Sequence, residues 1–317
     1  MNWAEIIFDS VSPAQTWQSI FAALLDIAKN SATPFALHDE TVSADRLISE
    51  AAWELWQAYP QVATRTTQTL REWCSGPSAG GRAVLVLDAL SLRELPMLLR
   101  GARQHGIQIQ SIQVTGAEVP SLTDQFARAL GCSSRGALAN DAKPGTLLLF
   151  AGDVYTDVTG VPFEDYPIPH SPNIIVWHTW LDDLIHLQNR LPEQVAASAS
   201  SVLQGDGFWK FVNKIRKGRR LVITSDHGYA VSKLFSSEVT DPEAHDLLRN
   251  AFGASRYKSA EQEWDRRFMP PLVMSHNQHH VIMGQWKWKV QGGFPHICHG
   301  GMSLLEVAVP FVELTEL

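Results

Sequence analysis

The chain has 317 residues, a formal net charge of −7 and 45% apolar residues. This length suits one large α/β domain with an extension, or two smaller domains. The negative charge argues against a protein that coats DNA with its whole surface, although it leaves room for a local basic groove. No apolar run approaches the roughly 18 residues of a membrane helix, so we expect no membrane partner.

The cysteines and the N-terminus indicate the compartment. The three cysteines are widely spaced, which predicts a reducing environment without disulfides; they are Cys74, Cys132 and Cys298. The first residues lack the basic and then apolar pattern of a secretory signal. We therefore expect a cytoplasmic protein.

Residues 1–78 have the apolar spacing of helices, at 17–27, 43–59 and 62–73. They contain no cluster of acids, bases or metal ligands. We expect this helical extension to pack against the rest of the chain, and a partner-binding surface is the alternative. The turn-rich segment Ser75–Gly81 separates it from residues 79–317, which we expect to form the main domain.

Strand and helix patterns alternate after this break. Apolar strand patterns lie at 83–87, 107–114, 146–151, 173–177 and 221–224. Helical patterns lie between them, at 91–103, 124–130, 180–187 and 202–220. Alternation of this kind favours the α/β class, with a mostly parallel sheet flanked by helices. Residues 229–275 give few signals, and 278–284 has the pattern of a strand.

Acidic and imidazole side chains follow two of the predicted strands. Asp88 comes directly after 83–87, and Asp226 and His227 come after 221–224. The carboxyl ends of strands in open α/β sheets face the ligand crevice. An Asp and a His supply the oxygen and nitrogen ligands that zinc accepts. Gly228 would permit the backbone turn that brings both side chains to one ion, and a plain polar turn is the alternative.

Two further segments carry candidate metal ligands. Asp182 and His186 are four residues apart, so a helix would place them on one face. A solvated helix face is the alternative for this pair. His299 precedes two glycines that would allow the backbone to approach a site closely, and His296 is a competing candidate.

Thr123 lies at the start of the predicted helix over 124–130. Free N–H groups and the helix dipole favour anions at such a position. Its hydroxyl could cap the helix, or it could act as a nucleophile whose phosphoryl adduct the same amides hold. Ser91 and Ser121 are close enough in sequence to compete for the second role.

The candidate ligands together comprise three Asp and three His: Asp88, Asp182, His186, Asp226, His227 and His299. This number divides into two sets of three, as in two-metal sites whose ions lie about 3.5–4 Å apart. Three carboxylates would repel one another at close range. Two divalent cations would offset that charge and leave the site slightly positive, so that it would attract a phosphate.

The order of these motifs resembles the alkaline phosphatase superfamily. It runs from Asp88 through Pro120–Thr123, the Asp182 and His186 pair and Ser225–Gly228 to His299–Gly301. The closer resemblance is to the PglZ domain, known from bacterial anti-phage systems of the BREX and Pgl type. The segments that carry it are Val84–Leu90, Ile223–Gly228, His299–Ser303 and Val307–Pro310, and it covers about residues 80–317.

The resemblance implies a role for each residue. Asp182, His186 and His299 would hold one of two divalent ions, and Asp88, Asp226 and His227 would hold the other. The ions would be zinc, with manganese as an alternative. Thr123 would attack phosphorus and form a phosphothreonine that water then releases.

The predicted activity is hydrolysis of a nucleotide or nucleic-acid phosphodiester, in bacterial anti-phage defence. Two features favour a nucleotide group: basic residues at 210–220 before the Asp226 strand, and the alternation of Trp286 and Trp288 with lysines. The alternative is a catalytically weak or inactive scaffold or sensor subunit of a defence complex. In that case residues 1–78 would be the surface for defence-system partner proteins.

Overall fold

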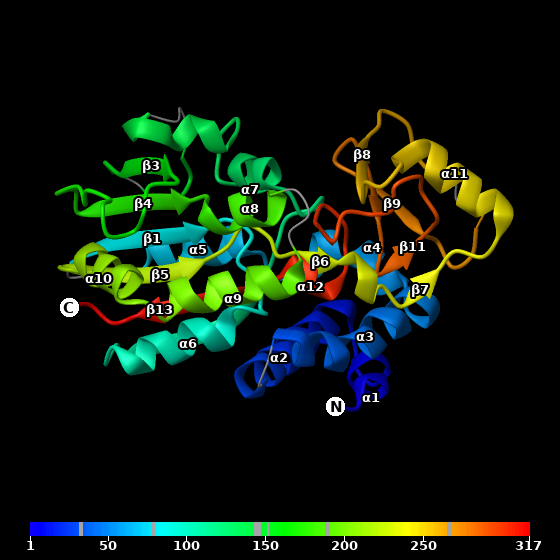
Figure 1. The fold of residues 1–317 in the computed structure, drawn as a ribbon, viewed down its shortest axis with the longest axis horizontal. Helices are drawn as coiled ribbons and strands as arrows, with labels where there is room; N and C mark the ends of the chain where they lie inside the picture. Colours follow the sequence, from blue (N-terminus) through cyan, green and yellow to red (C-terminus); the bar gives the residue numbers. More distant parts are fainter. Residues whose placement is uncertain (32–33, 78–79, 143–146, 151, 188–190, 265–267) are drawn as a thin grey trace.

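The computed structural model describes residues 1–31, 34–77, 80–142, 147–150, 152–187, 191–264 and 268–317. Its centre is a six-stranded sheet in the order β2-β13-β5-β1-β4-β3 (Figure 1). The strands are β1 (Gly81–Leu87), β2 (Ile109–Gly116), β3 (Tyr155–Thr159), β4 (Asn173–His178), β5 (Arg219–Thr224) and β13 (Ala308–Leu314). β3, β4, β1 and β5 pair in parallel, whereas β13 is antiparallel to both β5 and β2.

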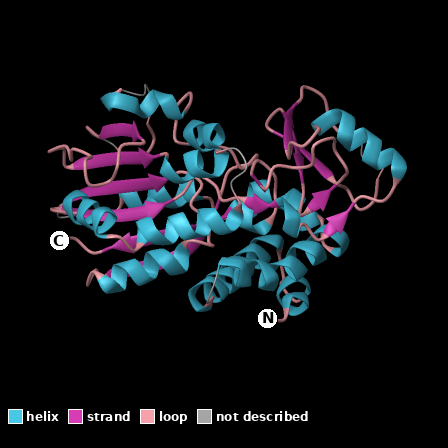
Figure 2. Ribbon diagram, in the orientation of Figure 1, coloured by secondary structure: helices cyan, strands magenta, loops and turns pink. Residues whose placement is uncertain are grey.

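Helices cover both faces of this sheet, as Figure 2 shows by secondary structure. Alternate residues of β1 point to opposite sides: Leu85 joins one apolar cluster and Val84 joins another. The first face packs against α6 (Leu95–Gln104), α9 (Pro192–Leu203) and α10 (Asp206–Ile215). The second packs against α5 (Thr66–Ser75), α7 (Thr123–Ala129) and the 3₁₀ segment η1 (Arg135–Asp141). The expected α/β class with a mostly parallel sheet flanked by helices is confirmed.

The N-terminal segment contains α1 (Trp3–Phe8), α2 (Pro13–Asn30), α3 (Pro34–Ala51), α4 (Glu54–Val62) and α5. The core of α1 to α4 joins the first face of the sheet, whereas α5 packs on the second. It contains an aromatic group in which Trp17 lies 5.0 Å from Trp56 and 4.8 Å from Tyr59, between ring centroids. The expected helix over 43–59 is instead divided between α3 and α4. The predicted boundary at 78/79 lies outside the described residues.

A smaller lobe follows β6 (Ala230–Val231) and η2 (Ser232–Leu234). It contains α11 (Pro242–Phe252) and the strands β7 (Ser237–Glu238), β8 (Tyr257–Ser259), β9 (Val273–His276), β10 (His279–Ile282) and β11 (Trp286–Lys287). These elements surround an apolar cluster of their own, beside the main sheet in Figure 1. The chain then returns through β12 (Ile297–Cys298) and α12 (Leu304–Val307) to β13.

One predicted strand of the sheet is absent, and one observed strand was not predicted. The strand expected over 146–151 is absent from residues 147–150, which have no regular structure, and residues 146 and 151 are not described. β3 forms the edge of the sheet instead. β13 was not predicted; within it the Pro310 carbonyl accepts a 2.8 Å hydrogen bond from Thr224 Oγ1.

Within the described part of the chain, no helix is both long and apolar enough to cross a bilayer.

Candidate metal centre

The predicted site residues lie together at one edge of the sheet. β1 has β4 and β5 as its parallel neighbours, so the carboxyl ends of all three strands meet there. Asp88 follows β1, and Asp226 and His227 follow β5. α8 (Trp180–His186), which begins two residues after β4, brings Asp182 and His186 to the same place.

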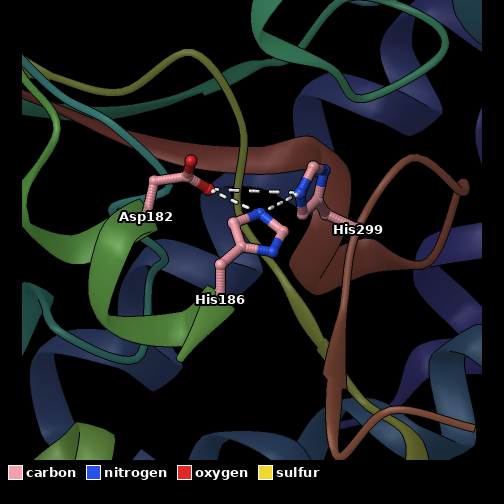
Figure 3. A group of neighbouring side chains, drawn as sticks. All are labelled: Asp182, His186 and His299. Carbon is pink, nitrogen blue, oxygen red and sulfur yellow. Dashed lines mark hydrogen bonds and ion pairs between the residues drawn. The ribbon is translucent and has the colours of Figure 1, made fainter. Parts of the chain in front are cut away.

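The first group of ligand atoms comes from Asp182, His186 and His299 (Figure 3). Asp182 Oδ1 lies 3.2 Å from His186 Nε2 and 4.0 Å from His299 Nε2. The two Nε2 atoms are 3.1 Å apart. The one-turn spacing on α8 produces the Asp182–His186 pair, while His299 approaches from the segment before α12. All three atoms face one point, as ligands of a single ion would.

The second group comes from Asp88, Asp182 and His227. Asp226 adjoins it, because its Oδ2 lies 3.3 Å from His227 Nε2. Its Oδ1 accepts a 3.0 Å hydrogen bond from the Ala89 N–H. Asp182 therefore belongs to both groups and lies between them. The resemblance implied two separate sets, with Asp182 in one and Asp88, Asp226 and His227 in the other, and this division stays a prediction.

The donor set fits divalent cations. Asp182 Oδ1 and Asp226 Oδ2 are buried, and neither oxygen makes a hydrogen bond of good geometry. Buried carboxylate oxygens without a donor are costly, and a cation would satisfy them. Carboxylate oxygens and imidazole nitrogens are ligands that zinc accepts. The residues of the first group could hold one ion, and Asp88, Asp226 and His227 a second.

Burial and repulsion between like-charged side chains shift the pKa values of this cluster. Burial, helped by the nearby Asp182 carboxylate, raises the pKa of Asp226 to about 6. Burial and the Asp226 and Asp182 carboxylates raise the pKa of Asp88 well above its usual range. Burial, with His227 close by, lowers the pKa of His299 to about 3. Without cations the cluster thus resists carrying all of its carboxylate charge.

Two contacts to Asp88 were not anticipated from the sequence. Trp177, on β4, donates a 3.0 Å hydrogen bond from Nε1 to Asp88 Oδ2. Arg135, in η1, pairs with the same oxygen and lies 3.9 Å from Asp182 Oδ2. The sequence presents Trp177 as an ordinary strand residue, and nothing local marks Arg135. Both contacts arise only when η1 and β4 fold beside β1.

Thr123 is the hydroxyl residue that faces the cluster. It is the first residue of α7, as expected. Its Oγ1 lies 3.4 Å from Asp88 Oδ1 and 3.3 Å from His227 Nε2, rather than capping its own helix. The side chain also borders a cavity of about 390 Å³ that reaches Arg135 and His299.

Ser121 and Ser91 have other contacts. The Ser121 hydroxyl donates to the Gly301 carbonyl at 2.8 Å and accepts from the Gly300 N–H at 2.9 Å. It therefore fastens the Thr123 segment to the segment that carries His299. Ser91 is fully buried and its Oγ accepts a 3.3 Å hydrogen bond from the Arg93 N–H.

The His299 segment rests on a buried ion pair. Glu306 Oε1 accepts from Arg256 Nε at 2.8 Å and from the Gly301 N–H at 3.0 Å. Its Oε2 accepts from the Ser303 N–H at 3.0 Å, as part of a capping box. These bonds hold the backbone that follows His299 in one position. The turn at Gly300 and Gly301 can therefore keep the His299 imidazole in place.

Other sequence-predicted residues lie elsewhere. The basic residues before Asp226 precede β5 or lie at its amino end, where Arg220 pairs with Glu313. A six-residue strand separates its two ends by about 20 Å, so these residues do not border the site. Trp288 is only 2% exposed and belongs to the core of the smaller lobe. His296 is exposed and lies outside both ligand groups.

Comparisons with known proteins give only distant likenesses. No protein-family model and no curated protein sequence matches the chain. Among solved structures, murine ectonucleotide pyrophosphatase/phosphodiesterase 5 has a TM-score of 0.44 and 15% identity, over 74% of this chain and 87% of that one. Phosphonoacetate hydrolase from Sinorhizobium meliloti 1021, in complex with phosphonoformate, has a TM-score of 0.39 and 14% identity, over 74% and 89%.

Proposed function

We propose that this chain is a phosphohydrolase that uses two divalent cations, zinc first and manganese as the alternative, to cleave a phosphodiester. The observation that supports this most is the position of Thr123. Its hydroxyl lies within 3.4 Å of Asp88 and 3.3 Å of His227, two of the six candidate ligands. A nucleophile beside a pair of ion sites is the arrangement that in-line phosphoryl transfer requires.

The reaction would proceed in two displacements. When bound, the cations would lower the pKa of the Thr123 hydroxyl and offset charge on the phosphoryl oxygens. Thr123 Oγ1 forms a bond to phosphorus as the bond to the leaving oxygen breaks; its proton passes to solvent, and the leaving oxygen takes a proton from water. Water then attacks phosphorus, the bond to Oγ1 breaks, and Thr123 recovers its proton. A phosphomonoester and an alcohol are the products.

The chain's own residues would orient the phosphate. Arg135 places a positive charge at the wall of the cavity that Thr123 borders. Ser121 holds the Thr123 segment against the His299 segment, so that nucleophile and ligands keep their spacing. The hydroxyls of Ser121 and Ser91 are already hydrogen-bonded to backbone groups, so both serines are poor nucleophiles. This supports Thr123 as the nucleophile.

The finer parts of the proposal rest on sequence resemblance. A PglZ-type protein in anti-phage defence would act on a nucleotide or nucleic acid, in the cytoplasm, with defence-system partners at residues 1–78. An inactive scaffold or sensor of the same system is the competing function.

Metal content and turnover test the proposal together. We expect the purified protein to contain up to two zinc or manganese ions by plasma mass spectrometry, and to hydrolyse bis-p-nitrophenyl phosphate faster than p-nitrophenyl phosphate. Asp226→Ala should lose metal and activity. The matched control is Asp183→Ala, because Asp183 lies on α8 beside Asp182 but accepts a 2.6 Å hydrogen bond from Thr179.

Faster turnover of the monoester would overturn the diester assignment. A protein that folds but neither holds metal nor hydrolyses either ester would be the scaffold instead.

A further inference from the structure

A second, larger cavity adjoins the candidate metal centre. It has a volume of about 800 Å³ and lies between the end of α8 and the segments 254–257 and 292–299. It shares His186, Tyr257 and His299 with the cavity that Thr123 borders. Because the two cavities share these residues, a group held in the larger one would lie next to a phosphate held in the other. Cavities of this size commonly hold ligands much larger than a bare phosphate.

The lining of this cavity is free of acidic residues. None of its lining residues carries a carboxylate, although the chain has a net charge of −7. The Arg256 guanidinium is paired with Glu306. The other ionisable lining residues are His186, Tyr257, His296, Cys298 and His299. Such a surface would not repel an anionic substrate. Exposed polar groups and aromatic faces together favour a planar, hydrogen-bonding group.

Tyr257 stands at the junction of the two cavities. It is half-buried at the start of β8, and its ring lies against the segment that carries His299: a Cβ at Gly300 would be 2.3 Å from Tyr257 Cδ1. The absence of a side chain at Gly300 thus allows the ring to stand directly beside the metal centre. A fixed aromatic face of this kind suits stacking with a base, which is insensitive to sequence.

We propose that this cavity binds the nucleoside of one phosphodiester arm, with the Tyr257 ring as the face on which the base stacks. The inference rests on the proposed function and names its substrate class. It also relocates the aromatic contact: the base is received by Tyr257, not by Trp286 and Trp288, whose rings belong to the cluster of the smaller lobe. The second arm, next to Thr123, is then free to be any leaving group.

Three phosphodiesters that share the same leaving group, p-nitrophenol, test this inference. They are the p-nitrophenyl esters of thymidine 5′-phosphate, phenyl phosphate and methyl phosphate. We expect the thymidine ester to have a KM about tenfold or more below that of the methyl ester. Tyr257→Ala should remove that preference by raising the KM of the thymidine ester to that of the methyl ester, whereas Tyr257→Phe should keep it. Phe8→Ala, which removes a 53% exposed aromatic ring on α1, is the matched control.

A binding measurement separates this inference from the proposed function. Calorimetry of the metal-loaded protein should show thymidine 5′-monophosphate binding about tenfold more tightly than methyl phosphate, with the difference lost in Tyr257→Ala. Metal content and thermal unfolding of each variant verify that the His299 segment is intact. Equal KM values for all three esters, in an active enzyme, would overturn the cavity assignment alone. No hydrolysis, with the binding difference present, would overturn only the proposed reaction.

Discussion

At the scale of single residues, each side chain's role follows from what its polar atoms contact. Thr123 and Ser121 are two residues apart, yet the first hydroxyl faces Asp88 and His227 while the second bonds to two backbone groups of the His299 segment. Residue type alone could not distinguish them. The spatial partners make Thr123 the candidate nucleophile and Ser121 a positioning residue.

Thr123→Ala should therefore keep both metal ions and lose turnover by at least about a thousandfold, because the bond to phosphorus cannot form. Thr123→Ser should retain measurable turnover. Ser121→Ala should lower stability by about 1–3 kcal/mol, since it leaves the Gly300 N–H without its acceptor. Steady-state kinetics with metal analysis and urea unfolding would check this. Full activity in Thr123→Ala would move the nucleophile to water or another serine.

Arg135 supplies a positive charge in contact with two candidate ligands, Asp88 and Asp182. Its guanidinium must compete with a cation for those carboxylates. We expect Arg135→Ala to bind zinc or manganese roughly three- to tenfold more tightly, and to hydrolyse the diester more slowly. Calorimetric titration of the metal-free protein would measure the affinity, with Arg128→Ala on the exposed side of α7 as the control. Weaker metal binding would show that Arg135 supports the site instead.

At the scale of elements, α3 supports the metal centre from a distance. Asp45 accepts hydrogen bonds from the Leu304 N–H at 2.9 Å, at the start of α12, and from Gln285 Nε2 at 2.7 Å. The contact joins the N-terminal helices to the segment between His299 and β13. Burial raises the pKa of Asp45 to about 7, against hydrogen bonds from Leu304 and Gln285 that lower it.

This raised pKa gives a pH dependence with a definite sign. The folded chain holds the Asp45 proton more tightly than the unfolded chain, so stability should fall as pH rises from about 4 to about 7 and then level off. Asp45→Asn cannot ionise and should gain stability relative to the wild type across that range, by about 2–4 kcal/mol at most. Urea unfolding at pH 5 and pH 8 would measure it, with exposed Asp39→Asn as the control. If Asp45→Asn and the wild type differed by the same free energy of unfolding at pH 5 and at pH 8, ionisation of Asp45 would not be the cause.

At the scale of the whole molecule, the N-terminal helices and the sheet form one core. Trp17, Ile20 and Trp56 are fully buried in the same cluster as Leu85 and Ile223. Tyr59 adds a 3.0 Å hydrogen bond to the Ala117 carbonyl, between β2 and α7. Removal of these helices would expose a large apolar surface over β2 and α6.

Residues 79–317 should therefore not fold cooperatively when expressed alone, because the apolar surface that the helices cover would face water. Residues 1–78 supplied as a separate chain should restore the fold, at least in part. Circular dichroism and thermal unfolding would check both. If the shortened chain melted within about 5 °C of the full one, the helices would be a separable unit, available to bind a partner.

Several features could be predicted from local pattern. A buried apolar run followed by a polar residue predicts β1 with Asp88 and β5 with Asp226, because periodicity and burial are encoded in adjacent residues. The four-residue spacing of Asp182 and His186 likewise anticipates their common face on α8. These signals are local, and the sheet converts them into proximity at one edge.

Other features depended on segments far apart in the chain. The sharing of Asp182 between two ligand groups, the Arg135 contact with Asp88, and the burial of Trp288 all require the packing of distant elements. The sequence by itself determined the α/β class and the set of side chains that meet, since strand periodicity and order decide both. Only the tertiary structure decided how close those side chains lie and which hydroxyl faces them, because ångström distances depend on how the elements pack.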